Sequence, residues 1–221
     1  MKIIGFLPLL LLFFILSCNQ PDSTAASAKP NIVLILADDL GWRQIGCMGS
    51  TFYVTPHIDQ LAAGGMRFTD AYSAAPVCSP TRASLMTGKY PARLHLTDYI
   101  KGMNEPEKSP LKLPDWTPYL KLEEVTIAEA LKELGYTTAC FGKWHLSKEK
   151  QPPGSESHNP DKQGFDQSFV TYKPEKGLAQ PWQTPENDGH NVKLITEKSL
   201  KFIEENRDRP FFPFSLQARM L

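Results

Sequence analysis

The sequence predicts an α/β fold with a parallel sheet. Two runs carry this prediction. Residues 31–37 are apolar without the alternation of a half-exposed strand, and residues 136–141 predict a second short buried strand. Stretches with helical start and stop signals separate the two runs. Both runs end in charged residues, which is where open α/β sheets place their ligands.

The length and net charge of the chain indicate one domain and argue against a nucleic-acid-binding protein. A chain of 221 residues suits one domain with a core of its own. The 24 basic and 24 acidic residues give a formal net charge of zero, so no net field attracts nucleic acid. No basic stripe or RNA-binding signature is present, and we expect no nucleic-acid partner.

Residues 1–17 are predicted to be a signal peptide of the lipoprotein type. A positive start is followed by an almost wholly apolar run, which is too short for a membrane-spanning helix of about 20 residues. Ile15-Leu16-Ser17-Cys18 resembles a bacterial lipobox, although Leu16 is a less usual residue there. We expect residues 18–29 to form a flexible tether and the protein to reach the periplasm or cell envelope, anchored to the membrane by lipid on Cys18. The alternative is simple cleavage and secretion.

Export implies an oxidising compartment in which cysteines can pair. Cys47 and Cys140 could form a disulfide, or they could be two isolated buried thiols.

The first apolar run, 31–37, has the length and β-branched content of a strand buried on both faces. Asp38 and Asp39 follow it directly, at the carboxyl edge of the predicted sheet. Their hard oxygen ligands favour Ca²⁺ or Mg²⁺ over softer metals, whereas a plain turn or helix cap is the alternative. A helix with Thr55 as cap is expected to end at Gly64, and residues 66–72 are expected to form a strand.

The next stretch is predicted to deliver Cys78 to the start of a short helix. Ser79 could cap the free amides, Pro80 suits the first helical position, and Gly88 suits the position after the last turn. The helix dipole there favours negative charge, and Arg82 adds a positive fork about one turn on. These features together suit an anionic ester, although a half-buried thiol before an ordinary helix is the alternative.

Residues 91–121 are expected to form a loop, after which Thr126 and Glu129 form a capping box for a helix. The strand predicted at 136–141 leads into Lys143 and His145. Its carboxyl end should bring both side chains to the edge that holds Asp38, Asp39 and Cys78.

The C-terminal third predicts fewer elements. Residues 148–185 read as an excursion over the surface, and residues 192–205 as an amphipathic helix. Pro213, which follows residues 209–212, lacks a donor for an interior sheet position, so we expect a strand there to stop early.

Three stretches closely resemble the sulfatase family. The first is Cys78-Ser79-Pro80-Thr81-Arg82 with the following Ala-Ser-Leu-Met-Thr-Gly-Lys, which resembles the family signature. Residues 30–42 resemble its N-terminal metal strand, and residues 141–146 resemble its second signature. The resemblance implies a doubly wound, mixed but mostly parallel sheet of the alkaline phosphatase and sulfatase type. It also implies hydrolysis of a sulfate ester of a small molecule or glycan.

The resemblance also implies roles for single residues. Cys78 would be oxidised by a maturation enzyme to formylglycine, whose hydrated aldehyde is the nucleophile. Asp38, Asp39 and residue 78 would hold Ca²⁺, with Mg²⁺ as the less favoured cation. Arg82 would support the nucleophile's surroundings. Lys143 would bind sulfate and His145 would contact the nucleophile.

The resemblance covers about residues 29–212 and then fails. Gln163 stands where relatives carry histidine, and no counterpart is found for the Asp-Asn pair that completes the metal shell, a second sulfate-binding lysine or a C-terminal subdomain. We therefore expect residues 30–221 to be a partial N-terminal catalytic domain, incomplete at the C-terminus, with little activity by itself. A phosphate-ester hydrolase of the same superfamily and a non-catalytic surface lipoprotein derived from a sulfatase are the alternatives.

Overall fold

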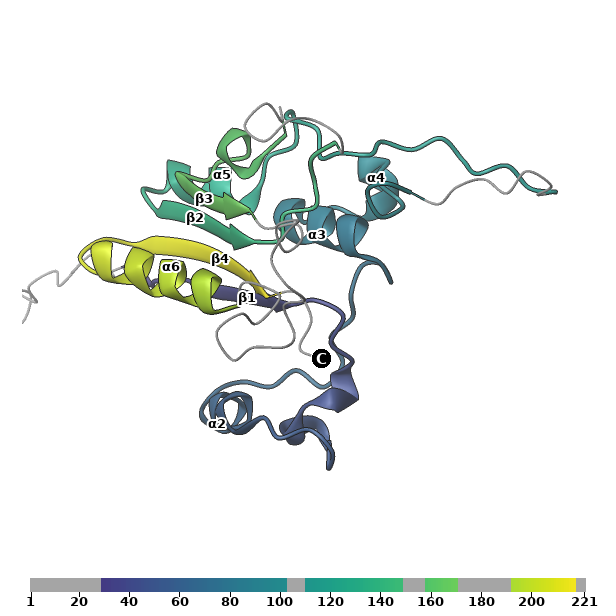
Figure 1. Ribbon diagram of the computed structural model, residues 1–221. Helices are drawn as coiled ribbons and strands as arrows, with labels where there is room; N and C mark the ends of the chain where they lie inside the picture. The colour runs from purple at the N-terminus through teal and green to yellow at the C-terminus, as the bar shows by residue number, and fades with distance from the viewer. Residues whose placement is uncertain (1–28, 103–109, 149–157, 171–191, 218–221) are drawn as a thin grey trace, which may run out of the picture. The chain divides into compact units, whose positions relative to one another are not determined.

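The computed structural model describes residues 29–102, 110–148, 158–170 and 192–217 (Figure 1). The signal peptide and most of the tether predicted for residues 1–29 lie outside the described residues, so those expectations stay predictions. Among the helices of the described ranges, none is both long and apolar enough to cross a membrane.

A parallel sheet of four strands forms the centre of the described chain. The strands lie in the order β1-β4-β2-β3, and all three pairings are parallel. Their bounds are β1 Leu34–Ala37, β2 Thr137–Gly142, β3 Gln167–Val170 and β4 Phe211–Gln217. The predicted α/β fold with a mostly parallel sheet is confirmed.

Helices pack on both faces of this sheet, which makes the fold doubly wound. On one face, residues of α3 (Cys78–Thr87) and α5 (Ile127–Glu133) join Cys140 and Phe212 in one core cluster. On the other face, α6 (Val192–Glu205) packs Ile195 and Phe202 against strand residues (Figure 1). Neighbours on β2 such as Ala139 and Cys140 belong to different clusters because successive strand side chains point to opposite faces.

The remaining elements are helices, of which α2 is the longest and the others have one turn each. They are η2 Trp42–Gln44, η3 Gly46–Met48, α2 Pro56–Gly64, α4 Pro91–Leu94 and η4 Pro160–Lys162. The helices predicted to end at Gly64 and to span 192–205 are confirmed as α2 and α6. The Thr55 side chain does not cap α2; its hydroxyl accepts from Gly46 N instead. The loop expected at 91–121 contains α4.

The capping box before α5 is confirmed in detail. Thr126 Oγ1 accepts from Glu129 N at 3.2 Å, and Glu129 Oε2 accepts from Thr126 N at 2.7 Å. Thr126 Oγ1 also donates to the carbonyl of Gln163 at 2.8 Å. One hydroxyl thus starts the helix and fixes the chain that leads into β3.

The expectation for the first strand is partly wrong. It begins at Leu34 rather than Asn31, and it is not buried on both faces, because Ile35 is 64% exposed and Val33 49% exposed. Within the described residues β1 pairs with β4 alone, so it lies at an edge of the sheet.

Two local predictions before the site are also wrong. Residues 66–72 form no strand; the chain there is irregular, and Met66 and Phe68 are exposed. Ser79 does not cap α3, because the helix begins at Cys78 and Ser79 Oγ instead accepts from Ile100 N at 2.9 Å. Gly88 does end the helix, with a left-handed φ of 67° and its N–H bonded to Ser84 O.

Pro213 does not end β4. The strand continues to Gln217 and lies between β1 and β2, with Pro213 opposite Ala139 of β2. Alternate residues of a parallel strand bond to opposite neighbours, and Phe211 O accepts from Ile32 N, so Pro213 also faces the β1 side. The β1 ladder begins only at Leu34, one position past Pro213, and the bond before it, from Ile32 N to Phe211 O, needs no donor from Pro213.

The surface excursion expected at 148–185 is only partly described, and residues 158–170 within it are structured. They form η4, a turn and β3, and the sequence indicates neither η4 nor β3. Gly164 has a φ of 90°, and a Cβ there would lie 2.5 Å from Glu129 N. Glycine is therefore required where this turn crosses the start of α5.

Cys47 and Cys140 are both free thiols, as the second alternative expects, but only Cys140 is buried; Cys47 is half-buried. Cys140 is fully buried in the core, and burial raises the pKa of its thiol far above the usual value.

Candidate active site

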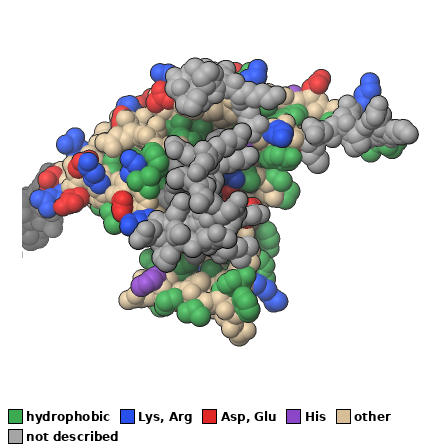
Figure 2. Space-filling model, viewed as in Figure 1, with side chains coloured by type: hydrophobic (Ala, Val, Ile, Leu, Met, Phe, Trp, Pro, Cys, Tyr) green, Lys and Arg blue, Asp and Glu red, His purple; other side chains and the backbone are tan. Residues whose placement is uncertain are grey.

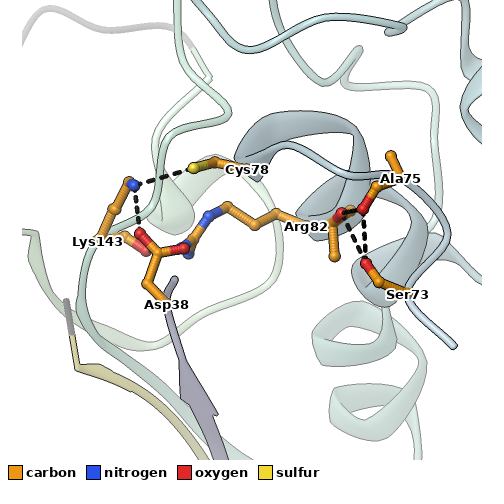
Figure 3. Close-up of polar contacts among 7 residues, drawn as sticks. Asp38, Ser73, Ala75, Cys78, Arg82 and Lys143 are labelled. Carbon is orange, nitrogen blue, oxygen red and sulfur yellow. Dashed lines mark hydrogen bonds and ion pairs between the residues drawn. The ribbon is translucent and has the colours of Figure 1, made fainter. Parts of the chain in front are cut away.

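The loop before α3 is fastened to the helix by hydroxyl groups. Ser73 Oγ and Thr81 Oγ1 both donate to the carbonyl of Ala75 at 2.8 Å, and the two hydroxyls lie 3.0 Å apart (Figure 3). This arrangement fixes the approach of the chain to Cys78, the first residue of α3.

Asp38, at the carboxyl end of β1, pairs with two cations. Its Oδ1 accepts from Arg82 Nη2 at 2.7 Å, and its Oδ2 accepts from Lys143 Nζ (Figure 3). Arg82 is only 2% exposed and also donates from Nη1 to the carbonyl of Lys143 at 2.9 Å. The guanidinium thus joins the ends of β1 and β2 through α3.

The charge of Asp38 is maintained by these partners. Burial by itself raises the pKa of this carboxyl, but the hydrogen bond from Lys143 and the positive charges of Arg82 and Lys143 outweigh burial. The net pKa lies below the usual value, so Asp38 is an anion at neutral pH.

Lys143 links the carboxylate to the candidate nucleophile. Its ammonium lies 3.3 Å from Cys78 Sγ while it pairs with Asp38, and Figure 3 shows it between the two groups. The expectation that β1, α3 and β2 bring these residues to one edge therefore agrees with the geometry.

Asp39 adds a second carboxylate beside Cys78. One ligand atom each from Asp38, Asp39 and Cys78 lies within 4.8 Å of the other two. Asp39 has a φ of 57°, a left-handed conformation that is uncommon outside glycine and marks a sharp turn directly after the strand. The three predicted metal ligands are thus brought together.

His145 lies close to the site and is nearly buried, at 8% exposure. Its Nε2 donates to the carbonyl of Ile100 at 2.9 Å, since a carbonyl can only accept. Burial lowers the pKa of His145 to about 4, and the nearby Lys143 and Arg82 charges act in the same direction. The imidazole is therefore neutral at neutral pH.

Ile100 is a positioning residue that the sequence did not reveal. Its N–H donates to Ser79 Oγ and its carbonyl accepts from His145, so one backbone unit connects the start of α3 to the imidazole. Backbone contacts leave no side-chain signal in a sequence, and none could have indicated this one.

The site opens into a pocket of about 340 Å³. Asp38, Asp39, Cys78 and Arg82 line it together with the loop that precedes α3. The position of Cys78 on the wall gives it access to this pocket.

Comparison with known proteins agrees with this geometry. The sequence model of the family described as Sulfatase matches residues 30–217. The chain belongs to the sulfatase family. It is 37% identical over 203 residues to arylsulfatase A of Homo sapiens, which covers 89% of this chain and 37% of that protein. It is also 37% identical over 229 residues to N-acetylgalactosamine-6-sulfatase of Canis lupus familiaris, covering 91% of this chain and 41% of that protein.

Solved structures agree with the family assignment. The crystal structure of Ps i-CgsB matches with a TM-score of 0.64 at 30% identity, over 87% of this chain and 45% of that chain. The chain thus spans less than half the length of these relatives.

Proposed function

We propose that the site formed by Cys78, Lys143 and Asp38 serves the hydrolysis of a sulfate ester. The contact of Lys143 Nζ with Cys78 Sγ at 3.3 Å is the observation that carries the proposal. It places a cation beside the nucleophile position at the start of α3, where the helix dipole also favours an anion. A transferring sulfate group needs stabilisation of this kind.

The nucleophile of this proposal is formylglycine, produced from Cys78 by a maturation enzyme. When formed, it supplies a hydrated aldehyde whose hydroxyl can attack sulfur. The Cys-x-Pro-x-Arg pattern at 78–82 supports this assignment, and so does the position of Cys78 on the pocket wall.

Ca²⁺ fits the carboxylates of this site, with Mg²⁺ as the less favoured cation. Asp38 and Asp39 offer hard oxygen atoms, and Ca²⁺ accepts irregular sets of about six to eight oxygens. The soft thiol of Cys78 suits such a cation poorly, whereas an oxygen at residue 78 would complete the trio. When bound, the cation supplies Lewis-acid polarisation of the sulfate oxygens.

The protein's own residues hold and balance the charges. Lys143 offsets the negative charge of the sulfate, and Arg82 keeps both Asp38 and the Lys143 backbone in place. Because His145 Nε2 donates to Ile100, its Nδ1 is the acceptor nitrogen, the form that can orient a hydroxyl on residue 78.

The names of relatives support the substrate class. They include arylsulfatase A and an N-acetylgalactosamine-6-O-sulfatase of Bacteroides thetaiotaomicron, the latter 40% identical over 162 residues. A matching crystal structure is that of Ps i-CgsB in complex with k-i-k-neocarrahexaose. We propose a sulfated small molecule or glycan as substrate, and an exported protein that lipid on Cys18 anchors to the cell envelope.

Peptide mass spectrometry of chain produced with a formylglycine-generating enzyme tests the nucleophile. Residue 78 should carry an aldehyde, while Cys47, which lacks the surrounding pattern, should stay a thiol in the same digest. An unmodified thiol at residue 78 in a host known to mature other sulfatases would contradict the assignment.

Release of sulfate from an aryl sulfate tests the reaction. The described residues offer three candidate metal ligands, so we expect turnover of the chain alone far below the roughly 10 s⁻¹ typical of enzymes. This slow release should disappear in the matched variant Cys78→Ala. Release that is equal in both proteins would refute the proposed reaction, and turnover near 10 s⁻¹ would show that no further groups are needed.

A further inference from the structure

The turn that carries His145 has an uncommon backbone conformation and is fastened on both sides. His145 has a φ of 58°, in the left-handed region that few residues other than glycine adopt. Before it, the carbonyl of Lys143 accepts from Arg82 Nη1 at 2.9 Å. After it, the carbonyl of Leu146 accepts from Leu120 N at 2.9 Å. Such a conformation persists only where the surrounding structure fixes it, and these two contacts hold the turn on either side.

Leu120 is itself held by the buried amide of Gln163. Gln163 Nε2 donates to the carbonyl of Leu120 at 3.1 Å, so Leu120 is bonded through both its N–H and its carbonyl. Figure 2 shows acidic and basic side chains interspersed on the surface of the molecule, in contact with solvent. Gln163 and Leu120 are instead buried, at 0% and 1% exposure, so water does not compete for their bond.

The backbone of Gln163 is fixed separately from its side chain. Its N–H donates to the carbonyl of Pro160 at 2.9 Å, and its carbonyl accepts from Thr126 Oγ1 at 2.8 Å. Thr126 is the N-cap residue of α5, so the attachment is to the end of a helix. The amide of Gln163 therefore projects from a rigid support, which a residue that positions others requires.

The oxygen of the same amide has no such use. Gln163 Oε1 has no hydrogen-bond partner among the described residues, although the side chain is wholly buried. A buried acceptor without a partner costs free energy, so an apolar side chain of similar size would fill this space at least as well. Core packing therefore does not explain the amide, whereas its donor to Leu120 does.

We propose that Gln163 is a positioning residue for His145. It acts through Leu120 and Leu146, and it keeps the imidazole where Nε2 donates to the carbonyl of Ile100 at 2.9 Å. The inference rests on the proposed function in one respect, since that function gives the imidazole its role beside the nucleophile.

Exchange of ring protons with water tests the proposal in the 221-residue chain. Nuclear magnetic resonance of isotope-labelled protein at neutral pH measures how fast the Nε2–H of His145 exchanges, and loss of the signal in His145→Asn identifies it. Gln163→Met keeps the length of the side chain but removes the donor and the unpaired oxygen. Exchange at His145 should become roughly tenfold faster, because a looser turn opens more often. The midpoint of urea unfolding should not fall.

The indole of Trp144 is the reference within the same turn. Its Nε1–H donates to the carbonyl of His158 at 2.9 Å, a contact that does not include Leu120. Exchange of this proton should be the same in Gln163→Met as in the unchanged chain.

Two further variants separate the donor from the surrounding turn. Gln163→His should restore slow exchange at His145, because the Nε2–H of histidine lies as many bonds from Cβ as that of glutamine. Thr138→Val is the matched control, since it removes another buried donor to this turn, from Thr138 Oγ1 to the carbonyl of Gly164 at 2.7 Å. It should leave exchange at His145 unchanged.

An unchanged exchange rate in Gln163→Met, or no recovery in Gln163→His, would overturn the proposal. Equal acceleration at Trp144, or in Thr138→Val, would show that Gln163 only stabilises the turn in general and would overturn it as well. These measurements need neither hydrolysis nor formylglycine, so a failure here is distinguishable from a failure of the proposed function.

Discussion

Replacing Arg82 by methionine should destabilise the fold strongly. The side chain is 2% exposed and connects α3 to β1 and β2 through two hydrogen bonds, at 2.7 Å to Asp38 and 2.9 Å to the Lys143 carbonyl. Its Nε has no hydrogen-bond partner among the described residues, so these two bonds carry its polar contribution. Methionine keeps much of the buried volume but removes both.

The loss of stability in Arg82→Met depends on the contacts that Asp38 keeps in the variant. Removing one partner of a buried ion pair typically costs about 3–5 kcal/mol, because the other charge stays buried without compensation. Here Lys143 still pairs with Asp38, so we expect a loss at the low end, about 3 kcal/mol in the free energy of unfolding. Arg82→Lys should lose less, since it keeps the charge but not the two-pronged donor.

Urea unfolding followed by circular dichroism measures this loss. Lys201→Met is the control, because Lys201 pairs with Glu205 at 3.7 Å on the exposed side of α6. An exposed helix pair of this spacing contributes only about 0.3–0.5 kcal/mol. If Arg82→Met costs under about 1 kcal/mol, or no more than the control, the view that this guanidinium holds the strand ends together is wrong.

Three further predictions concern pH, metal and location. The pKa of His145 is about 4 in the folded protein against 6.5 in the unfolded chain. The stability that the neutral imidazole contributes is therefore complete above pH 6.5 and is lost as the pH falls to 4. The free energy of unfolding should fall by about 3 kcal/mol from pH 6.5 to pH 4, and by less in the variant His145→Asn. If the pH dependence were the same in that variant, His145 would not be its source. Asp39→Asn should weaken Ca²⁺ binding by the matured chain at least tenfold in calorimetry, whereas the exposed Asp208→Asn should not; equal affinities would remove Asp39 from the site. Cys18→Ala should release the protein from the membrane fraction, and continued membrane binding would refute the lipid anchor.

The parts of the site that the sequence predicted depend on local signals. A buried run followed by charged residues predicts the end of a strand, and this reasoning placed Asp38 and Lys143 at one edge. The capping box at Thr126 predicted α5 equally well, because all of its hydrogen bonds lie within four residues. Such signals need no knowledge of which strands are neighbours.

The errors concern properties that depend on contacts between residues far apart in the sequence. An apolar run predicts burial, but β1 has one described neighbour, so Ile35 remains exposed. Residues 167–170 show no strand pattern by themselves and become β3 because their backbone pairs with β2. Ser79 has the right residue type for a cap, yet its hydroxyl is bonded to Ile100, a partner 21 residues away.

The position of β4 explains why the site uses long cationic side chains. β1 and β2 are not adjacent, because β4 lies between them, so their ends are two strand spacings apart, about 9–10 Å. Gly142 is level with Leu216 and Ala37 with Gln217, which places Lys143 and Asp38 at nearly the same height on either side of β4. Two short side chains could not meet across this distance. Lys143 reaches Asp38 across the end of β4, and Arg82 reaches Asp38 from α3. β4 therefore sets the width of the site, although its Pro213 argued against an interior position in the sheet.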